Sequence, residues 1–233
     1  MSAAAQTDSW LRLCSGPSNA ALNMAVDAAL LETAPALGKP VLRFYSWTER
    51  AASFGYFQKY AEVRQMTQLR PLVRRPTGGG IVPHDADWTY SVTVPPGHAW
   101  YALKATDSYR RVHEWLRAAF LKLGAQSGLA SDCRKAQPGQ CFIGHEKFDV
   151  LWHGQKIAGA AQRRTRAGLL IQGSVQPPPV KIQRADWERA MCEAAAGDYG
   201  VAWMDLEAGS ALNRRAIELA ETVYSQASHN ERR

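Results

Sequence analysis

Three consecutive glycines, Gly78–Gly80, constrain the structure of this 233-residue chain more than any other feature. A backbone without Cβ atoms can adopt positive φ and can approach a neighbouring segment or a ligand closely. Arg74-Arg75 comes just before the glycines, with permanently charged, forked donors that suit a carboxylate or a phosphate. His84-Asp85 follows, and Trp88–Val94 then alternates as a strand does. The stretch therefore predicts either a glycine-dependent hairpin turn or a site for an anionic or acyl-bearing group.

The spacing of the glycines excludes two common phosphate-binding loops. No Gly-Lys-Ser or Gly-Lys-Thr follows the run, so it is not a P-loop. It also lacks the Gly-x-Gly-x-x-Gly spacing of a dinucleotide fingerprint, and a strand pattern rather than a helical one comes next. Neither class of nucleotide-binding loop is therefore predicted here.

The charge and composition of the chain limit which binding partners and which cellular compartment are expected. The net charge is +7 and the isoelectric point is about 9.4, which suits an acidic protein or a nucleic acid as partner. The arginine clusters match no nucleic-acid-binding motif, so we expect no nucleic acid partner. No apolar run reaches the ~18 residues of a membrane helix, and the first residues lack a secretory signal. Four cysteines without metal-ligand spacing indicate a reduced, cytoplasmic protein with no metal site and no membrane partner.

Periodicity predicts a single α+β domain over residues 1–233. Tyr109 is one of the regularly spaced apolar positions of the helix expected from Ala105. Residues 228–233 are expected to be frayed. The expected helices are Ser18–Glu32 with Ser18 as its cap, Ala61–Leu69, Ala105–Leu123, Asp186–Ala195 and Ala211–Ser225. The expected strands are Val41–Trp47, Ala51–Gln58, Trp88–Val94, Phe148–Trp152, Lys156–Arg163 and Leu169–Val175.

A second candidate site pairs Cys141 with Lys156. Cys141 lies in a loop-like stretch before a strand, and Lys156 begins the return strand of a predicted hairpin. A nearby ammonium favours the thiolate, which is the nucleophilic form of a cysteine. Alternatively, Cys141 is a small buried side chain and Lys156 points to solvent. The spacing alone leaves both interpretations open.

Four blocks of the chain together resemble the family of lipoyl (octanoyl) transferases and lipoate–protein ligases, which is related in fold to the biotin–protein ligases. The blocks are Leu22–Asp27, Ala52–Gln58, Arg74–Asp85 and Gly154–Arg164, and the last two are the most specific. The resemblance implies an α+β fold, a mixed β-sheet flanked by helices like the biotin/lipoate protein ligase catalytic domain. The motif-bearing core would cover about residues 18–175, followed by a C-terminal helical segment over residues 183–227.

The resemblance also implies roles for residues of the two candidate sites. The glycine loop would line a tunnel for a medium-chain acyl group. Lys156 would contact the carbonyl or activated carboxyl end of that group, where a cation stabilises developing negative charge. The implied substrate-binding residues are Arg74, Arg75, Thr77, Gly78, Gly79, Gly80, His84, Gly159 and Ala160.

Two activities share this scaffold. Octanoyltransferases move an octanoyl or lipoyl group from acyl carrier protein, through a cysteine thioester, to a lysine of a lipoyl-domain protein, without a cofactor. Lipoate–protein ligases use ATP and Mg²⁺ to form lipoyl-adenylate, and their lysine acts without a nucleophilic cysteine. The stretch from Cys141-Phe142 to Ser174 is most similar to the cysteine-dependent transferases of the ligase-like branch. The resemblance therefore implies Cys141 and Lys156 as the catalytic pair of a transferase, with the ATP-dependent ligase as the alternative.

Gln172 departs from the pattern of the cysteine-dependent relatives, which often have a histidine at this position. If that histidine assists the thiol, its absence weakens the transferase interpretation. His84 and His145 are the candidates to replace it, although the sequence places neither beside Cys141.

The implied partners are protein carriers of the acyl group. The donor would be octanoyl-acyl carrier protein, and the acceptors would be lipoyl-domain proteins, either glycine cleavage H protein or the E2 component of a 2-oxoacid dehydrogenase. These partners are generally acidic, so a net charge of +7 favours their encounter. A non-catalytic acyl carrier or a basic nucleic-acid-binding domain is the alternative of a different class, but neither explains the block around Lys156.

Overall fold

The structure, a computed structural model, describes residues 7–134, 144–177, 181–207 and 209–232. Its strands are β1 (Asp8–Ser18), β2 (Val41–Trp47), β3 (Ala51–Phe54), β4 (Leu72–Arg74), β5 (Val82–His84), β6 (Trp88–Val94), β7 (Gly128–Leu129), β8 (Val150–Trp152), β9 (Gln155–Thr165), β10 (Gly168–Val175) and β11 (Val201–Asp205). Its helices are α1 (Ala20–Leu37), α2 (Tyr60–Met66), α3 (Ala99–Ala102), α4 (Ala105–Lys122), α5 (Arg184–Tyr199), α6 (Ser210–Leu219) and α7 (Ala227–Asn230), with a π-helical turn over Ala220–Tyr224. Within these described residues, no helix combines the length and the apolar character needed to span a membrane.

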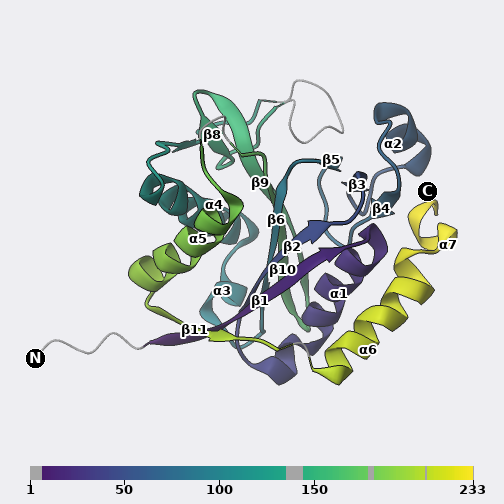
Figure 1. The fold of residues 1–233 in the computed structure, drawn as a ribbon, viewed down its shortest axis with the longest axis horizontal. Helices are drawn as coiled ribbons and strands as arrows, with labels where there is room; N and C mark the ends of the chain where they lie inside the picture. The colour runs from purple at the N-terminus through teal and green to yellow at the C-terminus, as the bar shows by residue number, and fades with distance from the viewer. Residues whose placement is uncertain (1–6, 135–143, 178–180, 208, 233) are drawn as a thin grey trace, which may run out of the picture.

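A mixed sheet forms the centre of the molecule, with strand order β11-β1-β2-β6-β10-β9-β8-β7 (Figure 1). β1 pairs in parallel with both β2 and β11, and the other neighbours in this sheet are antiparallel. A smaller sheet has the order β4-β3-β5. The predicted fold class, a mixed sheet flanked by helices, is confirmed.

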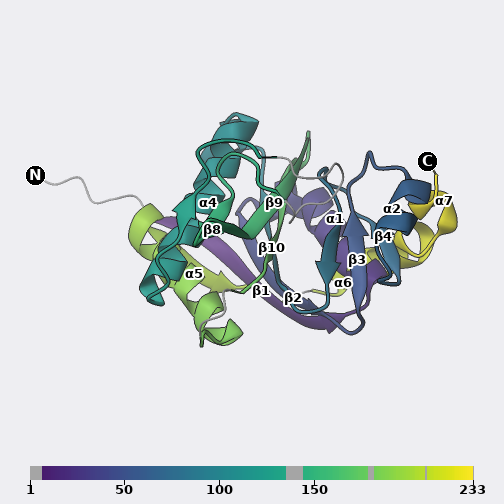
Figure 2. The same ribbon diagram turned by 90° about the horizontal axis from the view of Figure 1, so that it is seen from above.

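Side chains that alternate along the strands give the central sheet two different faces. On one face, Leu42, Phe44 and Tyr90 pack with Trp115 of α4 and Trp187 of α5 in the main hydrophobic core. On the opposite face, α1 contacts β2, β6 and β10, and α6 packs against α1. Figures 1 and 2 accordingly show α4 and α5 on one side of the sheet and α1 and α6 on the other.

A buried polar network around Asp27 joins α1 to the sheet. Asp27 Oδ1 accepts hydrogen bonds from Arg43 Nη1 at 2.7 Å and Ser91 Oγ at 2.6 Å. Its Oδ2 accepts from Gln172 Nε2 at 2.7 Å and Tyr45 Oη at 3.2 Å. Arg43 and Asp27 have no exposed side-chain surface, so each charge compensates the other where water is excluded. The network fixes α1 against three strands that form one wall of a cavity.

Several expected element ends are wrong: the strand expected to reach Gln58 ends at Phe54, and the helix expected to end at Glu32 runs to Leu37. Two further differences concern single contacts. Ser18 is the last residue of β1, paired with Trp47, and the cap of α1 is Asn19, whose Oδ1 accepts the Leu22 N–H at 2.8 Å. Residues 228–230, which were expected to be frayed, are held in place, because α7 packs against β4 and Asn230 Oδ1 accepts the Arg74 N–H at 2.8 Å. Both outcomes depend on partners far away in the sequence, which a local pattern does not reveal.

Candidate functional site

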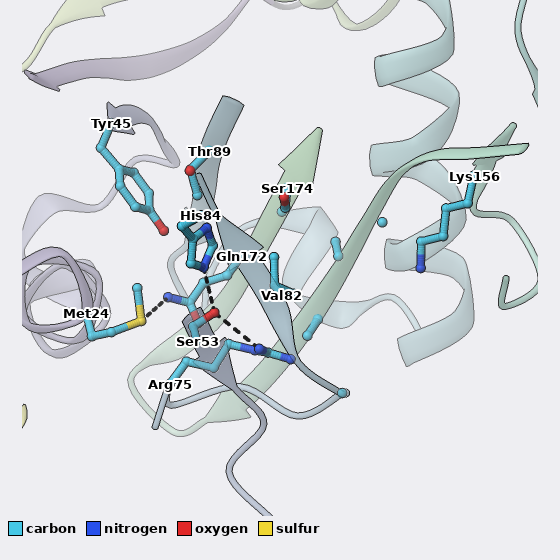
Figure 3. Close-up of a pocket in the computed structure, with 15 residues that line it drawn as sticks. Met24, Tyr45, Ser53, Arg75, Val82, His84, Thr89, Lys156, Gln172 and Ser174 are labelled. Carbon is cyan, nitrogen blue, oxygen red and sulfur yellow. Dashed lines mark hydrogen bonds between the residues drawn. The ribbon is translucent and has the colours of Figure 1, made fainter. Parts of the chain in front are cut away.

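A cavity lies between the central sheet and the three-stranded sheet. Its empty space, counted together with the open solvent at its mouth, is about 470 Å³. Residues of α1, β2, β6, β9 and β10 line one side, and residues of β3, β5 and the glycine loop line the other. Figure 3 shows these side chains, with Lys156 well separated from the cluster of Ser53, His84 and Arg75. The cavity therefore has two chemically different ends.

Arg75 and the glycine loop form one edge of the cavity. The Nη2 atom of Arg75 donates to the carbonyl oxygens of Gly78 at 2.6 Å and Gly80 at 2.7 Å, and its Nε donates to Gly78 at 3.1 Å. Gly79, between these two carbonyls, has a φ of +84° and lines the cavity. A Cβ on Gly55 would lie 1.9 Å from the Gly79 carbonyl oxygen, so the residue that follows β3 must also be glycine. The forked guanidinium thus fixes the loop backbone beside the cavity.

Lys156 reaches the cavity from β9 and is held by a buried carboxylate. Its Nζ lies 2.8 Å from Asp149 Oδ2, and the two side chains are 8% and 0% exposed. The Tyr109 hydroxyl of α4 donates to Asp149 Oδ1, and the Glu146 N–H donates to Oδ2 at 2.7 Å. Burial first, and then the negative charge of Asp149, raises the pKa of Tyr109 well above its usual value, so this hydroxyl keeps its proton. The ammonium is therefore fixed by a carboxylate that is itself fixed.

Gly159 provides the space that this lysine occupies. A Cβ at Gly159 would lie 2.6 Å from Lys156 Cε, 2.7 Å from its Nζ and 3.0 Å from Asp149 Oδ1. The first two distances are shorter than real Cβ contacts, so any larger residue would displace the lysine side chain of the ion pair. Gly159 is thus required by the packing of Lys156, which lies in the same Gly154–Arg164 block.

The deep end of the cavity is polar. Ser53 Oγ lies 2.8 Å from His84 Nε2, and His84 Nδ1 lies 2.9 Å from Asp87 Oδ2. The indole of Trp47 stacks on the imidazole, with ring centroids 3.8 Å apart. Ser53 and His84 are only 2% and 4% exposed, and both line the cavity. Hydrogen bonds and stacking therefore hold this imidazole in one orientation.

Gln172 has a structural role at its unusual position. It lines the cavity, and its Oε1 accepts a hydrogen bond from Thr77 Oγ1 at 2.8 Å. Its Nε2 donates to Asp27 Oδ2 at 2.7 Å. The amide therefore connects the glycine loop to the buried network around Asp27. A neutral histidine has one N–H donor fewer than the amide and a different shape, so it would form these contacts differently.

The structure brings six of the predicted site residues to one cavity. These are Arg75, Gly79, His84, Lys156, Gly159 and Ala160. Thr77, Gly78 and Gly80 support the same loop through the hydrogen bonds given above. Cys141 lies outside the described residues, and His145 Nε2 contacts Asp132 Oδ1 at 3.2 Å on the surface.

Arg74 faces away from the cavity. Its guanidinium donates to the carbonyl oxygens of Tyr56, Gln58, His229 and Asn230 at 2.7 to 3.1 Å. Adjacent residues in an extended segment point to opposite sides, so only Arg75 of the pair faces the cavity. Arg74 instead joins β4 to the segment around α7.

Sequence reasoning missed four residues at the two ends of the cavity: Ser53, Asp87, Tyr109 and Asp149. Tyr109 was expected only as an apolar position of its helix, but its hydroxyl binds Asp149. Asp149 precedes Lys156 by seven residues across a hairpin, and this hairpin spacing was the available signal. No local signal identifies Ser53 or Asp87, because each is an ordinary residue until the fold brings both to His84.

The geometry supports acyl chemistry. Met24, Val82, Ala160 and Ala161 supply apolar lining that suits a hydrocarbon chain. Lys156 supplies a fixed positive charge where a carbonyl oxygen of such a chain could lie, and a cation there stabilises negative charge that develops during acyl transfer.

Comparisons with known proteins agree with this chemistry. Residues 19–176 match the family model described as the lipoyl protein ligase A/B catalytic domain. Octanoyltransferase LipM of Anoxybacillus flavithermus is 34% identical over 180 residues, which cover 71% of this chain and 64% of that protein. Octanoyltransferase LipM of Staphylococcus aureus is 33% identical over 183 residues, which cover 72% of this chain and 66% of that protein. The chain thus matches slightly less than two thirds of the length of these curated relatives.

Solved structures share the fold. A putative lipoate protein ligase from T. acidophilum, solved with bound lipoic acid, superimposes with a TM-score of 0.82 at 21% identity. The match covers 97% of this chain and 100% of that one. A lipoate-protein ligase A bound with ATP gives a TM-score of 0.78 at 20% identity, covering 97% and 98% of the two chains.

Proposed function

Because the chain belongs to the lipoyl protein ligase A/B catalytic domain family, we propose that it transfers an octanoyl or lipoyl group to a lysine of a lipoyl-domain protein. The observation that carries the proposal is the ammonium of Lys156, fixed by Asp149 at the end of a cavity with an apolar lining. The names of the octanoyltransferase relatives favour octanoyl as the group transferred. The reaction needs no cofactor in this form.

Lys156 acts in this proposal as a fixed cation rather than as a base. Its ammonium is ion-paired with the buried carboxylate of Asp149, and an ammonium cannot accept a proton. The ammonium polarises the acyl carbonyl and stabilises the negative oxygen of the tetrahedral intermediate. Tyr109 and the Glu146 N–H keep the carboxylate in place, so the ammonium does not need to reorganise as charge develops.

Cys141 is the proposed nucleophile, on the strength of the resemblance to cysteine-dependent transferases. Its thiolate attacks the thioester carbonyl of octanoyl-acyl carrier protein, and the carrier thiolate leaves. The acceptor lysine amine then attacks the acyl-cysteine, the Cys141 thiolate is released, and the amine loses a proton. Each step exchanges one acyl bond for another, so no energy source is required.

The test is the intact mass of the purified protein after incubation with octanoyl-acyl carrier protein, beside the Cys141→Ser variant. We expect an octanoyl mass increment on the wild type that hydroxylamine removes. In the serine variant the increment is absent, or it is an ester that resists the same treatment. A wild-type protein without an adduct that still acylates a lipoyl domain would contradict the covalent mechanism.

An ATP-dependent lipoate–protein ligase remains the second candidate, because Lys156 can serve an adenylate without a cysteine and Gln172 stands where a histidine is often found. This candidate predicts that lipoate, ATP and Mg²⁺ acylate a lipoyl domain, and that Cys141→Ser keeps this activity. The same mass measurement of the acceptor, with lipoate and ATP in place of the octanoyl donor, distinguishes the two reactions.

Acidic carrier proteins are the proposed partners. The chain has 28 lysines and arginines against 21 aspartates and glutamates, and the expected donor and acceptors carry the opposite net charge. Binding of octanoyl-acyl carrier protein or of a lipoyl domain should therefore weaken as salt is raised. An affinity that is equal at low and high ionic strength would remove charge complementarity from the proposal.

A further inference from the structure

Ser53, His84 and Asp87 form a hydrogen-bonded series at the deep end of the cavity. Figure 3 shows the Ser53–His84 part of this series. The serine lies 2.8 Å from Nε2 of the imidazole, and the carboxylate lies 2.9 Å from Nδ1. Asp87 Oδ2 also accepts hydrogen bonds from Ser174 Oγ at 2.7 Å and Thr89 Oγ1 at 3.2 Å, so it is an acceptor toward the imidazole as well. Nδ1 then carries the proton, and Nε2 accepts the serine hydroxyl.

This is the arrangement of a nucleophile, a general base and an orienting carboxylate, which is recognised by geometry and not by fold. We propose that Ser53 is a second nucleophile, and that this end of the cavity hydrolyses small acyl esters. The proposal goes beyond the transfer reaction and uses neither Cys141 nor Lys156.

A cation stands beside the proposed nucleophile. Arg75 Nη1 lies 3.3 Å from Ser53 Oγ, and the rest of the guanidinium is bound to the carbonyl oxygens of Gly78 and Gly80. The arginine therefore cannot move away from the serine without breaking the loop. A negative oxygen that forms on a carbon bound to Ser53 Oγ would develop within reach of this positive charge.

The reaction is balanced with water as the only co-reactant. Ser53 Oγ bonds to the ester carbonyl carbon while its proton passes to His84 Nε2. The ester C–O bond breaks, and the leaving alcohol takes that proton from Nε2. Water then attacks the acyl-serine, gives a proton to Nε2 and forms the carboxylic acid. Ser53 leaves with the proton returned by His84.

Burial limits the substrates to small esters. Ser53, His84 and Thr89 are 2%, 4% and 3% exposed, whereas Gly79 at the edge of the cavity is exposed. Ser53 Oγ is therefore reached only from within the cavity, and the substrate class is a short-chain acyl ester that is not attached to a carrier protein.

The experiment uses the full chain with Cys141→Ala, so that the cysteine cannot contribute. The substrate is 4-nitrophenyl butyrate, and released 4-nitrophenol is measured at steady state. We expect turnover to persist in this variant and to fall by ~100-fold or more when Ser53→Ala or His84→Gln is added. Ser108→Ala is the matched control, because Ser108 is also fully buried and hydrogen-bonded but lies in α4 and does not line the cavity. It should hydrolyse the ester as the parent does.

A labelling experiment decides the matter if a variant does not fold. The Cys141→Ala protein is treated with a small fluorophosphonate, and the modified residue is located by peptide mass spectrometry. Modification of Ser53 supports the proposal. No modification, modification of another residue only, or unchanged hydrolysis after Ser53→Ala overturns it. None of these results depends on octanoyl-acyl carrier protein, so failure here and failure of the proposed transferase function are seen separately.

Discussion

The replacement of Gly159 by alanine tests whether the position of Lys156 controls acyl transfer. The new Cβ would lie 2.6 Å from Lys156 Cε, while ordinary contacts begin at 3.4 Å, so the side chain must move by about 0.8 Å, the difference between these two distances. The obstructing atoms belong to the end of a flexible side chain that borders a cavity, so the fold should tolerate the change.

The consequence for the reaction is much larger than that for the fold. A shift of about 1 Å in a catalytic group lowers the rate by ~10²-fold, which corresponds to about 2.7 kcal/mol in the activation free energy. We therefore expect Gly159→Ala to lose ~10²-fold in kcat for octanoyl transfer to a lipoyl domain, measured from the mass of the acceptor over time. Thermal unfolding of the variant should remain cooperative.

The control is Gly97→Ala, because a Cβ at Gly97 meets no atom within 4 Å and Gly97 does not line the cavity. This variant should transfer octanoyl groups at the wild-type rate. If folded Gly159→Ala were as active as the control, the ammonium would not need its observed position, and the role given to Lys156 would be refuted.

Three further perturbations address single interactions. Asp149→Asn removes the negative charge that fixes Lys156, so kcat for octanoyl transfer should fall at least ~10-fold with KM little changed; a rise in KM alone would contradict this role. Burial lowers the pKa of His113 from 6.5 to about 4, so the unfolded chain binds more protons between these values. The unfolding free energy should then fall by about 2 kcal/mol from pH 7.5 to pH 5, measured in urea, and His113→Gln should lack that part of the pH dependence. Arg74→Lys replaces a guanidinium that donates to four carbonyl oxygens with a single ammonium, which should lower the unfolding free energy by about 2–4 kcal/mol at neutral pH. An unchanged urea midpoint would show that the ammonium stabilises the fold equally well.

Strands with strong alternation could be predicted from the sequence, and strands that depend on distant partners could not. β6 has the predicted bounds, Trp88–Val94, and the predicted turn at His153-Gly154 has positive φ at both residues. β1 was missed because it contains Gly16-Pro17, and a register shift lies between Cys14 and Pro17. It is a strand because β2 and β11 pair with its two edges, and β11 is some 190 residues away.

The parts of the candidate site that need a glycine backbone could be predicted from the sequence. The parts that form only through tertiary contacts could not. The glycine loop stands out because few local structures need three consecutive glycines, and Lys156 was identified through the resemblance of the Gly154–Arg164 block. The twin arginines look equivalent in the sequence, but strand geometry sends Arg75 to the cavity and Arg74 to the opposite side. The carboxylate that fixes Lys156 and the serine beside His84 become visible only in three dimensions.

The contacts of Arg74 with residues 229 and 230 join parts of the chain that are about 155 positions apart. Contacts of such separation close late in folding, after local helices and hairpins have formed. The segment that enters the glycine loop therefore gains these hydrogen bonds only when α7 has docked on β4. Until α7 docks, the segment that enters the glycine loop lacks these hydrogen bonds, and the part of the cavity wall that the loop forms is without that support. Docking of α7 and formation of the glycine loop are in this way one cooperative step of folding.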